Sequence, residues 1–195
     1  MIEVSGISTK ARRDIGTTYR FRKESEVEQA VKEAVVSRGN KKPIYTGVRG
    51  IPVLNPTPKD ISENMLHQQF LHNKTKGIRV REELMTITAD EIPEDDKEKT
   101  IAKIADRFSD FYFDKGFQTA YGIYPFFSEE RGEGYDILYA INAVSFRDGS
   151  KYIRNSDEYD EEVNKAARFV LTEITGQEIS DEDKYVMQGL EYYGV

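Results

Sequence analysis

The sequence predicts an α+β fold in which a central, largely antiparallel five-stranded sheet is covered by helices on one side. Two observations lead to this prediction. Strand-like segments alternate with segments of helical periodicity along the chain. The segments 117–127 and 135–146 are separated by a loop that is too short for a crossover helix, so we expect them to form an antiparallel hairpin.

Caps and apolar spacing predict five helices. A hydroxyl residue followed three residues later by a carboxylate forms a capping box, and we expect such boxes at Ser25 with Glu28 and at Thr57 with Asp60. Glycines that can adopt a left-handed conformation mark the ends of the first four helices. The five helices are expected to begin at Ser25, Thr57, Pro93, Ser156 and Ser180.

Alternating and continuous apolar patterns predict five strands, at 2–8, 44–51, 78–88, 117–127 and 135–146. The last of these is apolar on both faces, which is typical of a strand in the middle of a sheet. The chain length of 195 residues favours one domain. We expect a domain over residues 1–176 and a helical C-terminal appendage over 177–195.

The composition excludes several classes of protein. The chain has no cysteine, which rules out disulfides, thiolate metal sites and a cysteine nucleophile. It has no apolar run of about 20 residues and no signal peptide at its N-terminus, so we expect a soluble cytoplasmic protein with no membrane partner.

Charge is distributed unevenly along the chain, whose net charge is -7. Residues 10–49 contain 11 Lys and Arg against 5 Asp and Glu, whereas residues 156–195 contain 3 against 11. The N-terminal part is therefore suited to phosphate, and the acidic C-terminal helices are suited to a basic protein partner.

The run from Tyr139 to Tyr152, YAINAVSFRDGSKY, resembles the histidine-motif strand and following turn of MobA/MobL relaxases, which are HUH endonucleases. The segments 116–123, 45–50, 56–77 and 155–176 resemble the family in the same order. This resemblance implies a relaxase fold and a function in plasmid mobilisation. Relaxases nick one DNA strand with a tyrosine nucleophile and a histidine-bound divalent metal ion.

The sequence departs from this family at its catalytic positions. Alignment on Asn142 places Asp136 and Leu138 at the paired histidines, and residues 123–125 at the upstream metal ligand. Residues 35–37 stand where the tyrosine is common. The resemblance therefore implies an impaired nickase, and Tyr19 and Tyr45 are the nearest replacement nucleophiles. For Tyr19, one of 12 tyrosines, an ordinary packing or surface role is the simpler interpretation.

An acidic metal site is the alternative to the missing histidine site. Asp136 with Glu129 and Glu133 would suit Mg²⁺ or Mn²⁺. The simpler interpretation, which we favour, is a solvated acidic hairpin loop. His67 and His72 are five residues apart on a predicted helix and would face different directions, so they are not expected to share a metal.

The candidates for DNA contact are basic residues of the N-terminal half. Arg79 and Arg81 alternate with apolar residues and would share one strand face, either as a nucleic-acid surface or as an ordinary solvated face. The full set is Arg12, Arg13, Arg20, Arg22, Lys41, Lys42, Arg49, Arg79 and Arg81.

These observations leave three hypotheses. The first is a relaxase-like protein of a plasmid or other mobile element that binds DNA, single-stranded or at a transfer origin, and is impaired as a nickase. The second is an active metal-dependent DNA strand transferase with a rebuilt acidic site. The third is a protein-interaction module that does not bind DNA.

Overall fold

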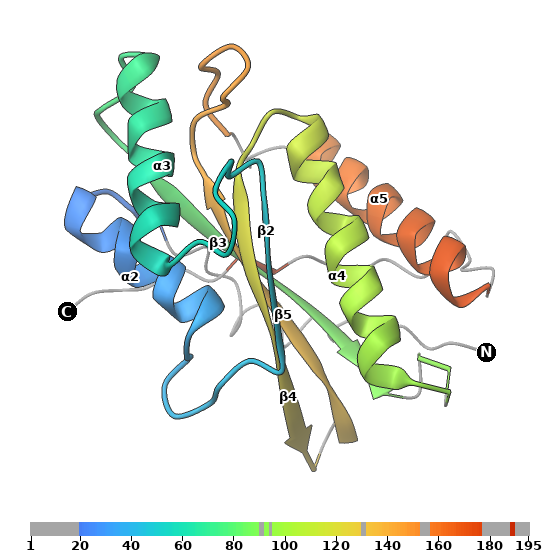
Figure 1. Cartoon of the computed structure of the whole chain (residues 1–195). Coiled ribbons are helices and arrows are strands. Elements are labelled where there is room, and N and C mark those ends of the chain that lie inside the picture. Colours follow the sequence, from blue (N-terminus) through green and yellow to red (C-terminus); the bar gives the residue numbers. More distant parts are fainter. Residues whose placement is uncertain are drawn as a thin grey trace.

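An open antiparallel sheet lies between two pairs of helices in the computed structural model of this chain (Figure 1). The structure describes residues 20–89, 92–93, 95–129, 132–152, 157–176 and 188–189. The predicted strand at 2–8, and residues 180–187 of the helix predicted from Ser180, lie outside these residues. The fold is α+β, as the sequence predicts.

Four strands of five or more residues form most of the sheet, and two-residue strands add to it beside β3. The strand order is β1-β3-β5-β4-β2, with β6 also paired to β3, and every pair is antiparallel. The strands are β1 (Arg20–Phe21), β2 (Tyr45–Arg49), β3 (Val80–Thr88), β4 (Thr119–Ser128), β5 (Gly132–Asn142) and β6 (Gln188–Gly189).

The central position predicted for residues 135–146 is confirmed for β5, which pairs with β3 on one side and β4 on the other. Leu138 lies opposite Leu84 on β3 and Gly122 on β4. The β4–β5 hairpin predicted from the short loop is also confirmed.

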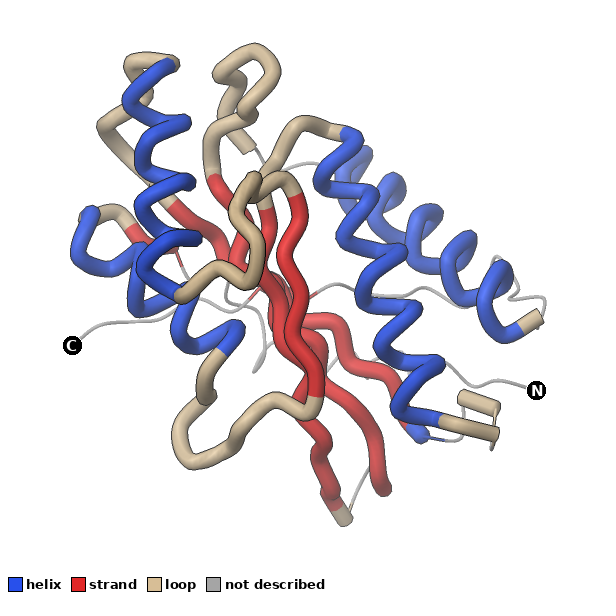
Figure 2. The backbone as a smooth tube through the Cα atoms, in the orientation of Figure 1, coloured by secondary structure: helices blue, strands red, loops and turns tan. Residues whose placement is uncertain are grey.

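Helices cover both faces of the sheet, so the prediction of cover on one side is wrong. Figure 2 shows one helix pair on either side of the strands. Even-numbered strand residues such as Ala120 and Ala140 pack against the first pair, and odd-numbered ones such as Tyr121 and Tyr139 pack against the second. The pairs are α2 (Glu24–Val35) with α3 (Pro58–Leu71), and α4 (Lys97–Asp114) with α5 (Asp157–Thr175).

The helix starts agree with the predictions in part. At α3 the predicted capping box is confirmed, because Thr57 Oγ1 accepts a hydrogen bond from the Asp60 amide at 3.2 Å and the Asp60 carboxylate accepts one from the Thr57 amide at 2.9 Å. At α2 the predicted box of Ser25 and Glu28 is wrong. There the Glu26 carboxylate accepts hydrogen bonds from the backbone amides that precede the helix, and Lys23 is the cap residue.

Within the described residues, no helix is long and apolar enough to cross a membrane.

Candidate functional site

The end of helix α2 lies directly on strand β4. The Tyr124 hydroxyl donates hydrogen bonds to the carbonyl oxygens of Glu33 at 2.6 Å and Ala34 at 3.1 Å. Gly122 lies beneath Ala34, where a Cβ atom would overlap the Ala34 carbonyl oxygen. A glycine at this position therefore allows the helix to approach the strand so closely.

Asp136 lies next to Tyr124 in the β4–β5 register and has two polar partners. Its carboxylate accepts a hydrogen bond of 2.7 Å from Thr86 Oγ1 on β3. The Arg38 guanidinium, which follows α2, lies 3.7 Å from the other carboxylate oxygen. Both side chains of this ion pair are partly exposed, so the end of α2 is also where the site opens to solvent.

Leu138 is fully buried and forms a small apolar cluster with Leu84 and Tyr124. Residues 35–37, Tyr124, Asp136 and Leu138 therefore meet at one place, although α2 and β5 are about a hundred residues apart in sequence. These are the positions that the resemblance assigns to the nucleophile and to the metal ligands.

The side chains at these positions do not fit the metal ion that the resemblance implies. Leu138 has no donor atom, and Tyr124 directs its proton to backbone carbonyls. Burial raises the pKa of Tyr124 to about 12, so its hydroxyl stays protonated. Asp136 is the one remaining anionic ligand, and it is paired with Arg38.

Glu82 is a buried carboxyl group on the same face of the sheet, and sequence reasoning missed it. Its side chain is 1% exposed, and its Oε1 atom has no hydrogen-bond partner among the described residues. Burial, followed by the charge of Glu33, raises the pKa of Glu82 to about 8 against the opposing effect of Arg38. The group is therefore mostly protonated at pH 7.

The neighbouring Glu83 points to the other face of the sheet, and both of its carboxylate oxygens accept hydrogen bonds. Its carboxylate accepts hydrogen bonds from the hydroxyls of Tyr112 at 2.8 Å and Tyr152 at 2.7 Å. Two successive carboxylates in a strand with helices on both sides are unusual, because each would have to be buried. The two successive glutamates were the sequence feature that could have indicated a buried carboxyl group at Glu82.

The three predicted acidic ligands are not brought together. Glu133 precedes Asp136 by three residues on β5, which places the two on opposite faces of the sheet. Glu129 is exposed in the turn between β4 and β5. Within the described part of the chain, no group of three histidine or acidic side chains is arranged to hold a metal ion.

Tyr45 lies on the other face of the sheet from Asp136. Its hydroxyl donates to the Asp106 carboxylate of α4 at 3.3 Å, and its ring stacks on Tyr121 with 6.3 Å between the centroids. Burial and the Asp106 charge raise the pKa of Tyr45, which is the opposite of what activates a phenol as a nucleophile. The other candidate, Tyr19, lies outside the described residues.

Arg79 and Arg81 are buried, at 6% and 5% exposure, so the expected exposed cationic strand face is wrong. The Arg79 guanidinium donates to Gln69 Oε1 at 2.9 Å and to the Glu24 carboxylate at 3.2 Å. Arg81 lies over the ring of Tyr152, which belongs to the core on the α4 and α5 side. Helices on both faces enclose this strand, and for that reason neither cation reaches solvent.

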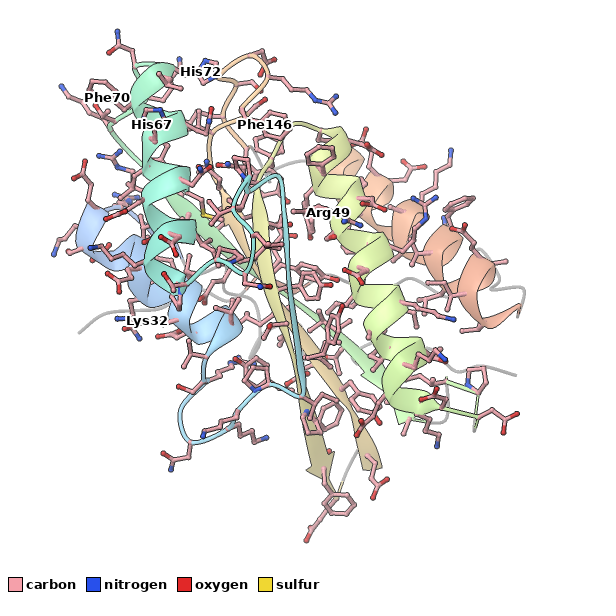
Figure 3. The ribbon with its side chains drawn as sticks, viewed as in Figure 1. Lys32, Arg49, His67, Phe70, His72 and Phe146 are labelled. Carbon is pink, nitrogen blue, oxygen red and sulfur yellow. The ribbon has the colours of Figure 1, made fainter. Side chains whose placement is uncertain are left out.

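The other predicted DNA contacts have different surroundings. Arg49 forms a 2.8 Å ion pair with Asp110, and Figure 3 shows it between β2 and α4. Lys41, Lys42 and Arg22 are exposed. Arg12 and Arg13 lie outside the described residues, and of Arg20 the structure describes the backbone, which pairs with β3.

The two histidines occupy different environments on α3. His67 is exposed, whereas His72 caps the helix and its Nε2 atom lies 3.3 Å from the Phe146 carbonyl oxygen. Figure 3 shows His72 beside the loop that carries Phe146, at the end of α3 that lies away from α2's C-terminus. His67 faces solvent and His72 faces the Phe146 loop, so the two histidines face different directions, as predicted.

Asn142, on which the resemblance is aligned, has a structural role. Its amide donates to Gln118 Oε1 at 2.9 Å and to the Met65 carbonyl at 3.2 Å. Its Oδ1 accepts from Gln69 at 2.9 Å and from the Val144 amide at 3.2 Å. This buried side chain thereby ties β5 to α3 and to Gln118, the residue just before β4.

Comparisons with known proteins find one distant likeness. The fold defines an α+β protein with an open antiparallel sheet. A solved structure described as the molecular basis of vancomycin resistance transfer in Staphylococcus aureus is similar to 91% of this chain and 97% of its own, at 13% identity and a TM-score of 0.45. No family model and no curated protein matches the chain.

Proposed function

We propose that this chain is a relaxase-like protein of a plasmid or other mobile element that binds DNA but does not nick it. The observation that carries the proposal is the convergence at the end of α2. Positions that the resemblance assigns to the nucleophile and to the metal ligands are distant in sequence and adjacent in space. Such an arrangement is expected if the fold was kept while the catalytic side chains were replaced.

The replacements explain why nicking would be lost. Cleavage of a phosphodiester needs an activated nucleophile and a cation that stabilises the charge developing on the phosphate. At the end of α2, Val35 and Val36 have no nucleophilic atom, and among the described residues the Ser37 hydroxyl forms no hydrogen bond with a base. On β5, Leu138 has no donor for a metal. A DNA-binding role in a mobile element would place the protein in the cytoplasm.

The second hypothesis, an active transferase with a rebuilt acidic site, is not favoured by this geometry. Asp136 and Glu133 lie on opposite sheet faces, and Tyr45 lies on the face away from Asp136. No described arrangement brings a nucleophile and an acidic metal site together.

The test uses labelled single-stranded oligonucleotides that carry transfer-origin sequences. We expect retention of the oligonucleotide that weakens as salt is raised, because phosphate contacts release counterions. With Mg²⁺ or Mn²⁺ present, we expect neither cleavage nor a covalent protein–DNA adduct. An adduct would contradict the loss of nicking, and a lack of retention at low salt would contradict DNA binding.

A further inference from the structure

The segment from Ala34 to Lys59 contains no acidic residue, which sets it apart in a chain with a net charge of -7. Its five cationic residues are Arg38, Lys41, Lys42, Arg49 and Lys59. Three of them lie within five residues, in the turn that joins α2 to β2. A local excess of positive charge in an acidic protein is the electrostatic pattern expected where a polyanion binds.

This α2–β2 turn, residues 36–44, is held at both ends. The Arg38 amide donates to the Lys41 carbonyl at 3.0 Å, and the Lys41 amide donates back to the Arg38 carbonyl at 3.1 Å. Gly39 between them has a φ of 58°, which a tight turn of this kind requires. The Ile44 amide then donates to the Ile123 carbonyl at 2.8 Å, where the chain enters the sheet. The cations are therefore carried by a fixed element.

The charges of this turn are poorly neutralised. Lys41 and Lys42 are exposed, and among the described residues neither has a carboxylate partner. The Arg38 guanidinium is partly exposed and forms an ion pair with Asp136 at 3.7 Å, beyond hydrogen-bond distance. By contrast, Arg49 is paired with Asp110 at 2.8 Å. The donors of the turn are available to an incoming phosphate.

An aromatic residue, Tyr45, lies three positions after Lys42, at the start of β2. Tyr45 is 41% exposed, while one part of its ring stacks on Tyr121 and its hydroxyl is held by Asp106. The ring is thus both fixed and accessible. Fixed aromatic rings beside basic residues are the usual means by which proteins bind single strands, since each base has a face that can stack.

We propose that the α2–β2 turn is the DNA contact of this protein, with Lys41 and Lys42 on the phosphates of a single strand and Tyr45 stacked on a base. The inference rests on the proposed DNA-binding function and assigns it a surface. The contact with Tyr45 favours single-stranded over duplex DNA, because a paired base does not offer its face to the tyrosine ring. It also gives Tyr45 a binding role in place of a nucleophilic one.

The test measures fluorescence anisotropy of a labelled 20-nucleotide single strand over a range of salt concentrations. The charge variant is K41E/K42E, and its matched control is K103E/K165E, which has the same net charge and changes two exposed lysines of α4 and α5. For K41E/K42E we expect at least about a tenfold loss of affinity. Because two phosphate contacts are lost, the slope of log K against log salt should become shallower by about 1.4. The control should remain within about threefold of the wild type.

Tyr45 is tested separately with Y45F and Y45L. Phenylalanine keeps the ring, so Y45F should bind as the wild type does, whereas Y45L should lose at least about fivefold in affinity. Circular dichroism and thermal unfolding establish that each variant is folded. Unchanged binding by folded Y45L would overturn the stacking role.

The outcomes separate this inference from the proposed function. If the wild type binds and K41E/K42E weakens no more than K103E/K165E, the turn is not the contact, although DNA binding stands. If the wild type binds no oligonucleotide at low salt, DNA binding itself fails. Tighter binding of duplex DNA, or of RNA with the same sequence, would overturn the assignment to single-stranded DNA.

Discussion

At the scale of single residues, Glu82 gives the clearest link between burial and a measurable property. The carboxyl group is enclosed by β3 and the end of α2, and its pKa is raised to about 8 chiefly by burial. In the unfolded chain the same group has a pKa near 4.5. The folded state therefore keeps a proton that the unfolded state releases as the pH rises from about 4.5 to about 8.

This difference predicts that stability falls through that pH range. Where the native state binds more protons than the unfolded state, the free energy of unfolding decreases by about 1.4 kcal/mol per pH unit for one group. Glu82→Gln removes the titration, so its stability relative to the wild type should increase by up to a few kcal/mol from pH 5 to pH 8. Urea unfolding at several pH values measures the difference, with Glu63→Gln at an exposed position as the control. A gap between the E82Q variant and the wild type that does not change with pH would contradict the raised pKa.

Asn142 carries a second prediction at this scale. Its amide satisfies groups on Gln69, Gln118 and the Met65 backbone, all in buried surroundings. Asn142→Leu leaves those groups unpaired, and each buried unpaired group costs about 1–3 kcal/mol. We expect a loss of at least about 3 kcal/mol in unfolding free energy. Ser150→Ala, which changes an exposed residue of the following turn, should cost less than about 1 kcal/mol. Equal effects of the two changes would show that the amide network contributes little.

At the scale of elements, the end of α2 depends on the close approach to β4. Gly122→Ala places a methyl group where the Ala34 carbonyl lies, so the helix end must move. We expect a loss of about 2 kcal/mol or more, with faster hydrogen exchange in the last turn of α2. Tyr124→Phe removes the hydrogen bonds to the same helix end without a clash and should cost only about 1 kcal/mol. Unchanged exchange in the G122A variant would contradict the contact.

The helices and strands also show which features of the fold could be predicted from local sequence patterns. The cap of α3 and the central position of β5 follow from local signals, a capping box and a strand that is apolar on both faces. Strand β3 shows the opposite case. Arg81, together with Arg79 just before the strand, indicated an exposed strand face, because charges are seldom buried unless they are paired. The partners of these two arginines include Gln69 and Glu24 on the helices and the ring of Tyr152, which no local pattern reveals, and so the helices on the second face were not predicted.

At the scale of the whole molecule, the candidate site depends on the convergence of separate elements. The resemblance indicated the positions of the site, but its chemistry depends on contacts between separate elements: the partners of Asp136 are Thr86 on β3 and Arg38 in the α2–β2 turn. The alternative acidic site of Asp136, Glu129 and Glu133 is not assembled, because strand alternation places Glu133 and Asp136 on opposite faces and Glu129 is exposed in the turn. The basic turn, in contrast, is contiguous in sequence, so Lys41 and Lys42 could be identified as cations without a structure.

This convergence predicts that a metal site can be built at these positions. Tyr124, Asp136 and Leu138 lie on one face of adjacent strands, so three histidines there should share one Co²⁺ ion. We expect Y124H/D136H/L138H to bind one equivalent of Co²⁺ with visible absorption bands, at a pH where imidazole is neutral. The wild type should show no such bands. In the control P125H/D136H/L138H, the first histidine is moved to the next residue of β4, which faces the opposite side of the sheet. Equal binding by the two folded variants, or none by either, would mean that these positions do not form a ligand set, and the proposed relaxase origin would lose its main support.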